Sequence, residues 1–176
     1  MFCCGNRMEK KMKCVMCDNN KLLKKQKTTK KYKESGLDNV TLHGVVYYKC
    51  DKCGEEYYGY GDQESLHALI ARVLILKKEL LTGKEVRFLR TYLGYSTTMF
   101  ASLTCYTVES ISRFETNDRD VSDKFDILVR AIVALKLPDP DRDYDLHDLW
   151  LNKQGESYNR IELNAKRNGW SVELAA

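Results

Sequence analysis

Two Cys-x-x-Cys pairs constrain this chain more than any other feature of its sequence. They are Cys14 with Cys17 and Cys50 with Cys53. Two residues between ligands let each pair form a tight turn that points both sulfurs at one ion. Two such turns together make a closed tetrahedral site of four thiolates, which structural zinc prefers and which iron also accepts. The sequence therefore predicts one metal site, with Zn2+ as the expected ion.

A redox role is the alternative for these cysteines. A lone Cys-x-x-Cys is typical of thioredoxin-like proteins, but no strand-helix pattern follows either pair here, and two pairs in one short segment are better explained by one metal. Between the pairs, residues 37–48 read as strand material around a turn expected at His43-Gly44. This segment has few large aliphatic residues, so the metal is expected to add folding free energy on the order of 10 kcal/mol.

Composition and charge bound the class of protein. The chain has 176 residues, 43% of them hydrophobic, which suits one medium domain or two small ones. No apolar run approaches the about 20 residues of a membrane helix, and the first residues lack the apolar core of a secretory signal. We therefore expect a cytoplasmic protein without a membrane span. Residues 1–11 are expected to be a disordered extension with Cys3 and Cys4 as reduced thiols.

Basic residues concentrate near the N-terminus. Residues 1–60 carry 13 Lys and Arg against 7 Asp and Glu, whereas residues 138–176 carry 5 against 8. The excess lies in a stripe without acidic residues, formed by Lys21, Lys24, Lys25, Lys27, Lys30, Lys31 and Lys33. Such a stripe suits a polyanion or an acidic protein surface, and it equally suits an edge strand whose lysines prevent aggregation.

The middle of the chain has the pattern of several short helices. Apolar residues at helical spacing predict a connector helix over residues 62–81 with Asp62 as its N-cap. A capping box follows at Thr82 to Glu85, Ser96 and Thr107 are expected to cap two short helices, and residues 120–123 to open another. Helices this short bury enough surface only if they cross steeply, as in a helix-turn-helix.

The segment 95–117 resembles the helix-turn-helix of phage-repressor-like (XRE) regulators. Ala101 is the small residue between the two helices, Thr107 is the cap, and Ile111 and Phe114 are the buried anchors. Cys105 holds the turn position that is usually Gly. Because a residue with a Cβ disfavours positive φ, either the turn is reshaped or Cys105 accepts strain.

A recognition helix in the major groove would contact DNA through its outward side chains. Arg113 is the best candidate for a base contact because its fork matches guanine O6 and N7, whereas Glu109 only accepts hydrogen bonds. The alternative for Arg113 is an ion pair with Glu109 or Glu115. The expected DNA-contacting set is Val108, Glu109, Ser112 and Arg113 on the outward face, Thr107 and Ser110 near the backbone, and Thr97, Thr98 and Arg90 at phosphates.

The order of these parts resembles the MqsA (YgiT-type) zinc-finger antitoxin family over residues 12 to about 137. The resemblance rests on Met12 to Cys17, the Lys- and Thr-bearing strand leading to Gly44-Val45, Cys50 to Glu55, and Ser112 to Glu115. It implies a zinc-bound N-terminal domain that neutralises a toxin protein and a helix-turn-helix that dimerises and represses at a palindrome. In that family an Asn and an Arg read DNA. Arg113 matches the Arg, but Glu109 replaces the Asn, which implies a different operator.

The acidic segment 138–176 exceeds the usual length of that family. It contains an amphipathic stretch at residues 146–151, and residues 161–165 and 170–174 alternate apolar and polar side chains around Asn168-Gly169. This pattern predicts a β-hairpin. Because a lone hairpin is marginal in water, we expect it to pack on the helical domain or, by preference, on a second subunit at a dimer interface.

The sequence thus predicts an α+β fold with a Cys4 zinc-binding domain (12–61) that holds a short sheet, a connector helix (62–81), an all-α helix-turn-helix domain (82–137) and a C-terminal hairpin or flap (138–176). The expected function is that of a homodimeric DNA-binding repressor and antitoxin of a type II toxin-antitoxin system. A stand-alone phage or mobile-element regulator and a protein-interaction adaptor are the alternatives. The three histidines are scattered and no catalytic motif is present, so no enzyme is expected.

Overall fold

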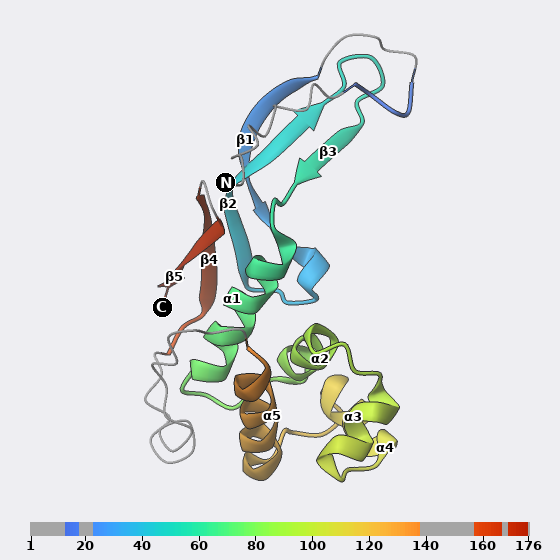
Figure 1. Ribbon diagram of the computed structural model, residues 1–176, viewed down its shortest axis with the longest axis vertical. Helices are drawn as coiled ribbons and strands as arrows, with labels where there is room; N and C mark the ends of the chain where they lie inside the picture. The colour runs from blue at the N-terminus through green and yellow to red at the C-terminus, as the bar shows by residue number, and fades with distance from the viewer. Residues whose placement is uncertain (1–12, 18–22, 138–156, 167–168, 176) are drawn as a thin grey trace, which may run out of the picture.

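The computed structural model describes residues 13–17, 23–137, 157–166 and 169–175. These residues combine one sheet with five α-helices, as the predicted mixture of α and β structure requires (Figure 1). In chain order the elements are β1 (Lys24–Lys31), a 3-10 turn (Lys33–Ser35), β2 (Val40–Lys49), β3 (Glu56–Gly59), α1 (Gln63–Leu76), α2 (Gly83–Tyr92), α3 (Thr97–Thr104), α4 (Val108–Glu115), α5 (Asp123–Lys136), β4 (Arg160–Lys166) and β5 (Gly169–Ala175).

Two of the predicted segments fall on other parts of the chain. The extension at residues 1–11, with Cys3 and Cys4, and the amphipathic stretch at residues 146–151 lie outside the described residues. Within the described ranges, every helix is too short or too polar to cross a membrane.

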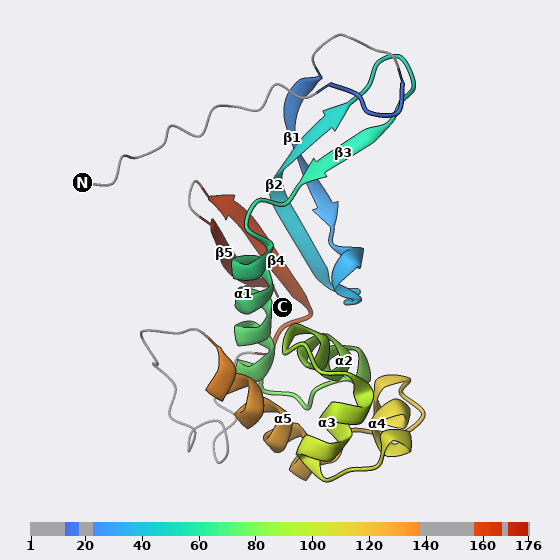
Figure 2. The same ribbon diagram turned by 45° about the vertical axis from the view of Figure 1, so that its right-hand side comes forward.

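The central strand of the sheet is β2. β1 pairs with it antiparallel, from Lys24 opposite Lys49 to Lys31 opposite Thr41. On the other side of β2, β3 pairs antiparallel with residues 46–49, and β4 pairs parallel with residues 40–43. β5 then pairs antiparallel with β4. The end of the sheet formed by β1, β2 and β3 projects away from the helices, and the other end lies beside α1 (Figures 1 and 2).

The turn predicted at His43-Gly44 is wrong, because β2 runs unbroken through both residues. Gly44 has a positive φ of 73° inside the strand, which glycine adopts at little cost. A Cβ at this position would lie 3.5 Å from the Cβ of Ala165 on β4. That is an ordinary contact distance, so the positive φ is what favours glycine here, and the residue marks an irregularity within the strand, not a chain reversal.

The C-terminal hairpin is present as β4 and β5, and within its own subunit it joins the sheet. Val40 to His43 of β2 pair with Ile161 to Asn164 of β4, so the hairpin extends the N-terminal sheet. It does not dock on the helical domain as a separate flap, although β5 contacts α1. Ile161 and Leu163 are fully buried there. The alternating pattern identified the hairpin but carried no information about which strand it would join.

Side-chain caps begin each helix. The Asp62 carboxylate accepts hydrogen bonds from the backbone N–H groups of Glu64 and Ser65. Thr82 and Glu85 form the capping box predicted for α2, with both reciprocal bonds present. Such a cap contributes about 1 kcal/mol. The remaining helices begin at the caps Ser96, Thr107 and Ser122.

One hydrophobic core extends from the sheet into the helices. Val40 and Leu42 of β2 belong to the same cluster of buried residues as Leu74 of α1 and Phe125 of α5. α1 contacts β5, α2 and α5 and so links the two parts of the fold. Residues 62–81 therefore act as a packed junction, since α1 ends at Leu76 and residues 77–82 lead directly into α2.

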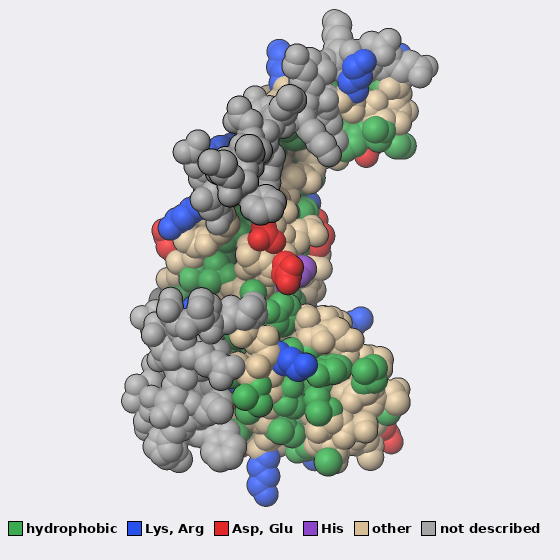
Figure 3. All heavy atoms as spheres, in the orientation of Figure 1, with side chains coloured by type: hydrophobic (Ala, Val, Ile, Leu, Met, Phe, Trp, Pro, Cys, Tyr) green, Lys and Arg blue, Asp and Glu red, His purple; other side chains and the backbone are tan. Residues whose placement is uncertain are grey.

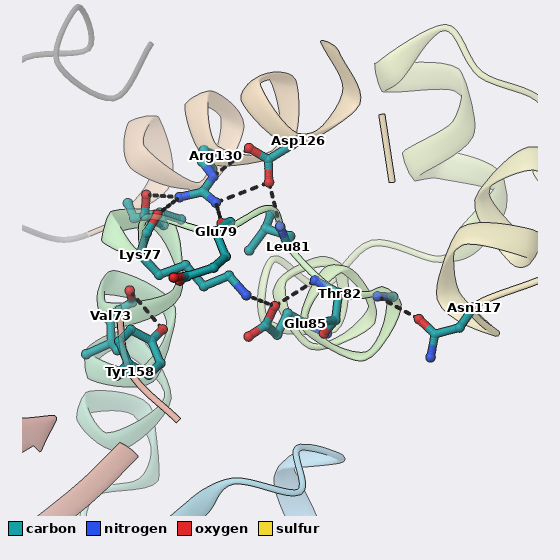
Figure 4. A network of polar contacts seen from close by, with 12 residues as sticks. Val73, Lys77, Glu79, Leu81, Thr82, Glu85, Asn117, Asp126, Arg130 and Tyr158 are labelled. Carbon is teal, nitrogen blue, oxygen red and sulfur yellow. Dashed lines mark hydrogen bonds and ion pairs between the residues drawn. The ribbon is translucent and has the colours of Figure 1, made fainter. Parts of the chain in front are cut away.

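A buried polar network holds this junction together (Figure 4). The Arg130 guanidinium donates to the carbonyl oxygens of Ile75, Lys77 and Glu79 at 2.6–2.8 Å. It also bonds the Asp126 carboxylate, which accepts the Leu81 N–H at 2.7 Å. Arg130 and Asp126 are only 3% and 0% exposed. These carbonyl oxygens lie at the end of α1 and in the chain after it, where the helix no longer supplies N–H donors. Arg130 supplies the donors instead.

Gly83 fits α2 tightly against α4. A Cβ at this position would lie 1.9 Å from the carbonyl oxygen of Phe114 and 2.6 Å from Oδ1 of Asn117. The Gly83 N–H donates to that same Oδ1 at 3.1 Å (Figure 4). The start of α2 therefore rests directly on the end of α4, which only glycine allows at this distance.

Candidate metal centre and the α3–α4 surface

The four cysteines of the two predicted pairs come together at the projecting end of the sheet. Their Sγ atoms all lie within 4.8 Å of one another. The Cys14–Cys53 distance is 3.5 Å and the Cys17–Cys50 distance is 3.7 Å. Sulfurs bound tetrahedrally at about 2.3 Å to one zinc ion lie about 3.8 Å apart. The four residues therefore fit one metal ion, and the chemistry of four thiolates favours zinc or iron.

The backbone turn after β2 positions the second pair. The Cys50 carbonyl oxygen accepts the Gly54 N–H at 2.9 Å, and the Cys50 N–H donates to the Glu55 carbonyl oxygen at 2.9 Å. Gly54 has a φ of 77°, a conformation that glycine adopts readily. This closed turn points both sulfurs of the second pair to the same side. Cys14 and Cys50 are buried, whereas Cys53 is exposed.

Tyr57 supports the metal centre, although sequence reasoning missed this role. Its hydroxyl lies 3.3 Å from Sγ of Cys14 and accepts the Val15 N–H at 3.1 Å. The hydrogen bond to Tyr57 lowers the pKa of the Cys14 thiol, which favours the thiolate form that binds metal. The side chain comes from β3, so only the pairing of β3 with β2 places it here, and the spacing of the cysteines gives no signal of it.

α3 and α4 form a pair of short helices joined by a tight turn. The Thr107 Oγ1 accepts the Ser110 N–H at 3.1 Å and lies 2.9 Å from the Ser110 Oγ. Cys105 ends α3 with a φ of 58°, so the turn keeps its left-handed conformation and this residue accepts the strain. The Cys105 side chain is exposed.

Ile111 and Phe114 are the buried anchors of α4, as predicted. Both are fully buried, and the Phe114 ring stacks on Phe125 of α5 with ring centroids 4.7 Å apart. The opposite face of α4 is exposed at Val108, Glu109, Ser112 and Arg113. The Arg113 Nε lies 3.7 Å from the Glu109 Oε1, a loose ion pair between two exposed side chains. On α3, Thr98 is exposed and Thr97 is half-buried.

Arg90 does not belong to this exposed surface, so the phosphate contact predicted for it is wrong. Its guanidinium binds the Glu115 carboxylate through two bonds of 2.6 and 2.9 Å and donates to the Tyr95 carbonyl oxygen. Both side chains of this pair are about nine-tenths buried. The pair ties the last residue of α4 to α2. The sequence gave no sign of this burial, because arginine side chains are mostly exposed.

The α3–α4 surface also carries apolar side chains. Met99, Leu103 and Val108 are 56%, 47% and 46% exposed. Figure 3 shows hydrophobic side chains gathered over part of the helical half of the molecule. Large exposed apolar side chains next to each other are common at protein contacts. The exposed faces of α3 and α4 thus carry both polar groups and large apolar side chains.

Comparison with known proteins finds no matching family model, no matching curated protein and no matching solved structure.

Proposed function

We propose that this protein is a sequence-specific DNA-binding transcriptional repressor stabilised by one zinc ion. The observation that carries the proposal is the pair α3–α4, in which Ile111 and Phe114 anchor the second helix and its polar face stays exposed. A helix-turn-helix presents its second helix to the major groove in this way. The tight left-handed turn at Cys105 and the Thr107 cap support the same interpretation.

Arg113 is the residue proposed to read a base. Its guanidinium matches the O6 and N7 acceptors of guanine, and its present partner Glu109 is 3.7 Å away on an exposed surface. An exposed pair of this kind contributes little, so exchanging it for a base costs little. Glu109 can accept from cytosine N4, and Ser112 and Thr98 can bond neighbouring base edges or phosphates.

The metal centre has a structural role in this proposal. Four thiolates close the coordination sphere, so no open position is left for a substrate. When bound, zinc would hold the segment of Cys14 and Cys17 against the turn of Cys50 and Cys53. The end of β2 that precedes Cys50 belongs to the projecting part of the sheet, away from α4 (Figure 2). The centre therefore stabilises the fold and does not read DNA.

Arg113→Ala is expected to weaken binding to the protein's own upstream region by about 1–3 kcal/mol, because one bidentate base contact is lost. A gel shift at several salt concentrations measures this change. Arg160→Ala on β4 is the matched control, since that arginine is exposed and β4 lies in the sheet, apart from α4 (Figure 1). A wild-type protein that shifts no DNA, or a shift indifferent to Arg113→Ala, would end the DNA-binding proposal.

A protein-interaction adaptor is the second candidate function. The exposed side chains of Met99, Leu103 and Val108 favour it, because they suit a protein contact better than a phosphate backbone. In an adaptor, α3 and α4 would serve packing and protein contact alone. The same gel shift separates the two functions, since an adaptor leaves DNA unbound at every salt concentration.

We propose further that the repressor is an antitoxin whose N-terminal sheet binds a toxin protein. Support comes from the resemblance to zinc-finger antitoxins and from the exposed lysines of β1 at Lys24, Lys25, Lys27 and Lys31, which suit an acidic protein surface. We expect the product of a neighbouring reading frame to copurify with this protein, and Lys24→Glu with Lys27→Glu to weaken that complex. Free elution of both proteins would favour a stand-alone regulator instead.

A further inference from the structure

The outer edge of β5 is open to another strand. In the part of the chain that the structure describes, β5 pairs with β4 on one side and with no strand on the other. An edge strand presents a row of N–H and C=O groups that an added strand can bond. β5 spans seven residues, which is longer than an ordinary strand of about 5–6 residues. It is thus long enough to form a full ladder with a partner.

Three strands of the described sheet have an open edge; β3 is only four residues long, and the two longer ones, β1 and β5, differ in how their edges are protected. β1 carries five lysines and an irregularity between Thr28 and Lys30, and both features discourage pairing with another strand. β5, with the sequence GWSVELA, has Glu173 as its one charged residue and contains no proline. Protection therefore lies on β1, and β5 is the edge at which association is expected.

We propose that β5 pairs antiparallel with β5 of a second copy of this chain, about a two-fold axis at Val172. This register places Trp170 opposite the partner's Leu174 and Ser171 opposite the partner's Glu173. Apolar side chains then meet apolar ones, and each carboxylate meets a hydroxyl that donates to it. A register centred on Glu173 would instead oppose two carboxylates. The sequence of β5 is complementary to itself about Val172, as a two-fold interface requires.

The partial exposure of the apolar side chains of β5 fits a second copy of the chain as the partner. Trp170 and Val172 pack against the core of their own subunit and remain partly exposed, and Leu174 on the same face is 37% exposed. In the dimer, the partner's Trp170 would cover Leu174. Burial of apolar area contributes about 25 cal/mol per Å2. The apolar face beside α1 would then run across both subunits, and the sheet would continue without a gap from one copy to the next.

This dimer does not depend on the proposed DNA binding. Self-association is measured by mass alone, with no DNA present. If the gel shift described above fails, the proposed dimer still stands. If the protein is a monomer, the gel shift still decides whether it binds DNA.

The test changes the charge at the proposed axis. Ser171 faces the neutral Asn164 within its own subunit. The carboxylate introduced by Ser171→Glu therefore meets no like charge directly opposite it in its own chain. In the dimer the introduced carboxylate opposes the partner's Glu173 at two symmetric places, which is expected to raise the dissociation constant about tenfold. Adding Glu173→Lys to this variant restores opposite charges and is expected to restore the dimer. Glu173→Lys alone faces the partner's Ser171 and should dimerise like the wild type.

Sedimentation equilibrium over a range of concentrations measures these dissociation constants, and thermal unfolding by circular dichroism checks that each variant is folded. Gln26→Glu on β1 is the matched control, because it adds the same charge to a different outer strand and should leave the dimer unchanged. A wild-type protein that stays monomeric at high micromolar concentration overturns the proposal. So does a dimer that Ser171→Glu leaves intact, or one that the double variant fails to restore.

Discussion

Replacing Cys50 with Ser, or removing the metal with a chelator, is expected to unfold the projecting end of the sheet while α2–α5 stay folded. Structural zinc contributes about 10–16 kcal/mol in zinc-finger peptides, so its loss exceeds what one small region can tolerate. At this end of the sheet, Val15 and Met16 are 78% and 68% exposed and bury no core of their own. A bound metal would therefore be the main contact between the two cysteine turns.

Hydrogen exchange followed by mass spectrometry measures the extent of this unfolding. Peptides that contain residues 45–59 should lose protection in Cys50→Ser, and peptides from α5 should keep it, because Phe125 and Val129 lie in the core far from the cysteines. Cys105→Ser is the matched control, since that thiol is exposed outside the cluster. Equal loss of protection in α5 would show that the sheet and the helices unfold as one cooperative unit.

Replacing Arg130 with Ala is expected to lower the free energy of unfolding by about 3–5 kcal/mol, because removing one partner leaves Asp126 as an uncompensated buried charge. The same change removes the donors to three carbonyl oxygens between Ile75 and Glu79. A buried carbonyl without a donor costs a further 1–3 kcal/mol, roughly. The stability of the protein is thus expected to be especially sensitive to this residue, although it belongs neither to the cysteine cluster nor to the exposed face of α4.

Urea unfolding followed by circular dichroism measures the loss, as a shift of the midpoint at constant slope. Arg130→Lys keeps the charge but lacks the planar fork, so an intermediate loss is expected. Arg87→Ala on the exposed side of α2 is the control and should stay within about 0.5 kcal/mol of the wild type. A similarly small change for Arg130→Ala would mean that the junction relaxes without its network.

Local signals were sufficient to predict the cysteine cluster and the helix starts. The two Cys-x-x-Cys pairs, the Thr82 capping box and the Thr107 cap each act over a few residues, so the sequence around them defines them. The buried anchors of α4 followed from helical periodicity for the same reason. The coarse fold class and the hairpin at residues 160–175 are confirmed on these grounds.

Long-range contacts account for the errors and omissions. Gly44 was read as a turn residue because glycine is common in turns, whereas here it has a positive φ within β2, where the pairing with β1 shifts register. Arg90 was placed at the surface because its partner Glu115 is on another helix. The role of Tyr57 was not predicted because only the pairing of β3 with β2 brings its hydroxyl close to Cys14. None of these contacts produces a periodic pattern in the sequence.

The parallel pairing of residues 40–43 with residues 161–164 has a consequence for synthesis on the ribosome. β2 leaves the exit tunnel long before β4 exists, so one side of Val40 and Leu42 waits uncovered in the nascent chain. At about 5–20 residues per second this interval lasts roughly 6–24 s. Closing so long a loop is also slow. A growing chain of this protein is thus exposed to chaperones and to wrong strand partners until translation has passed β4.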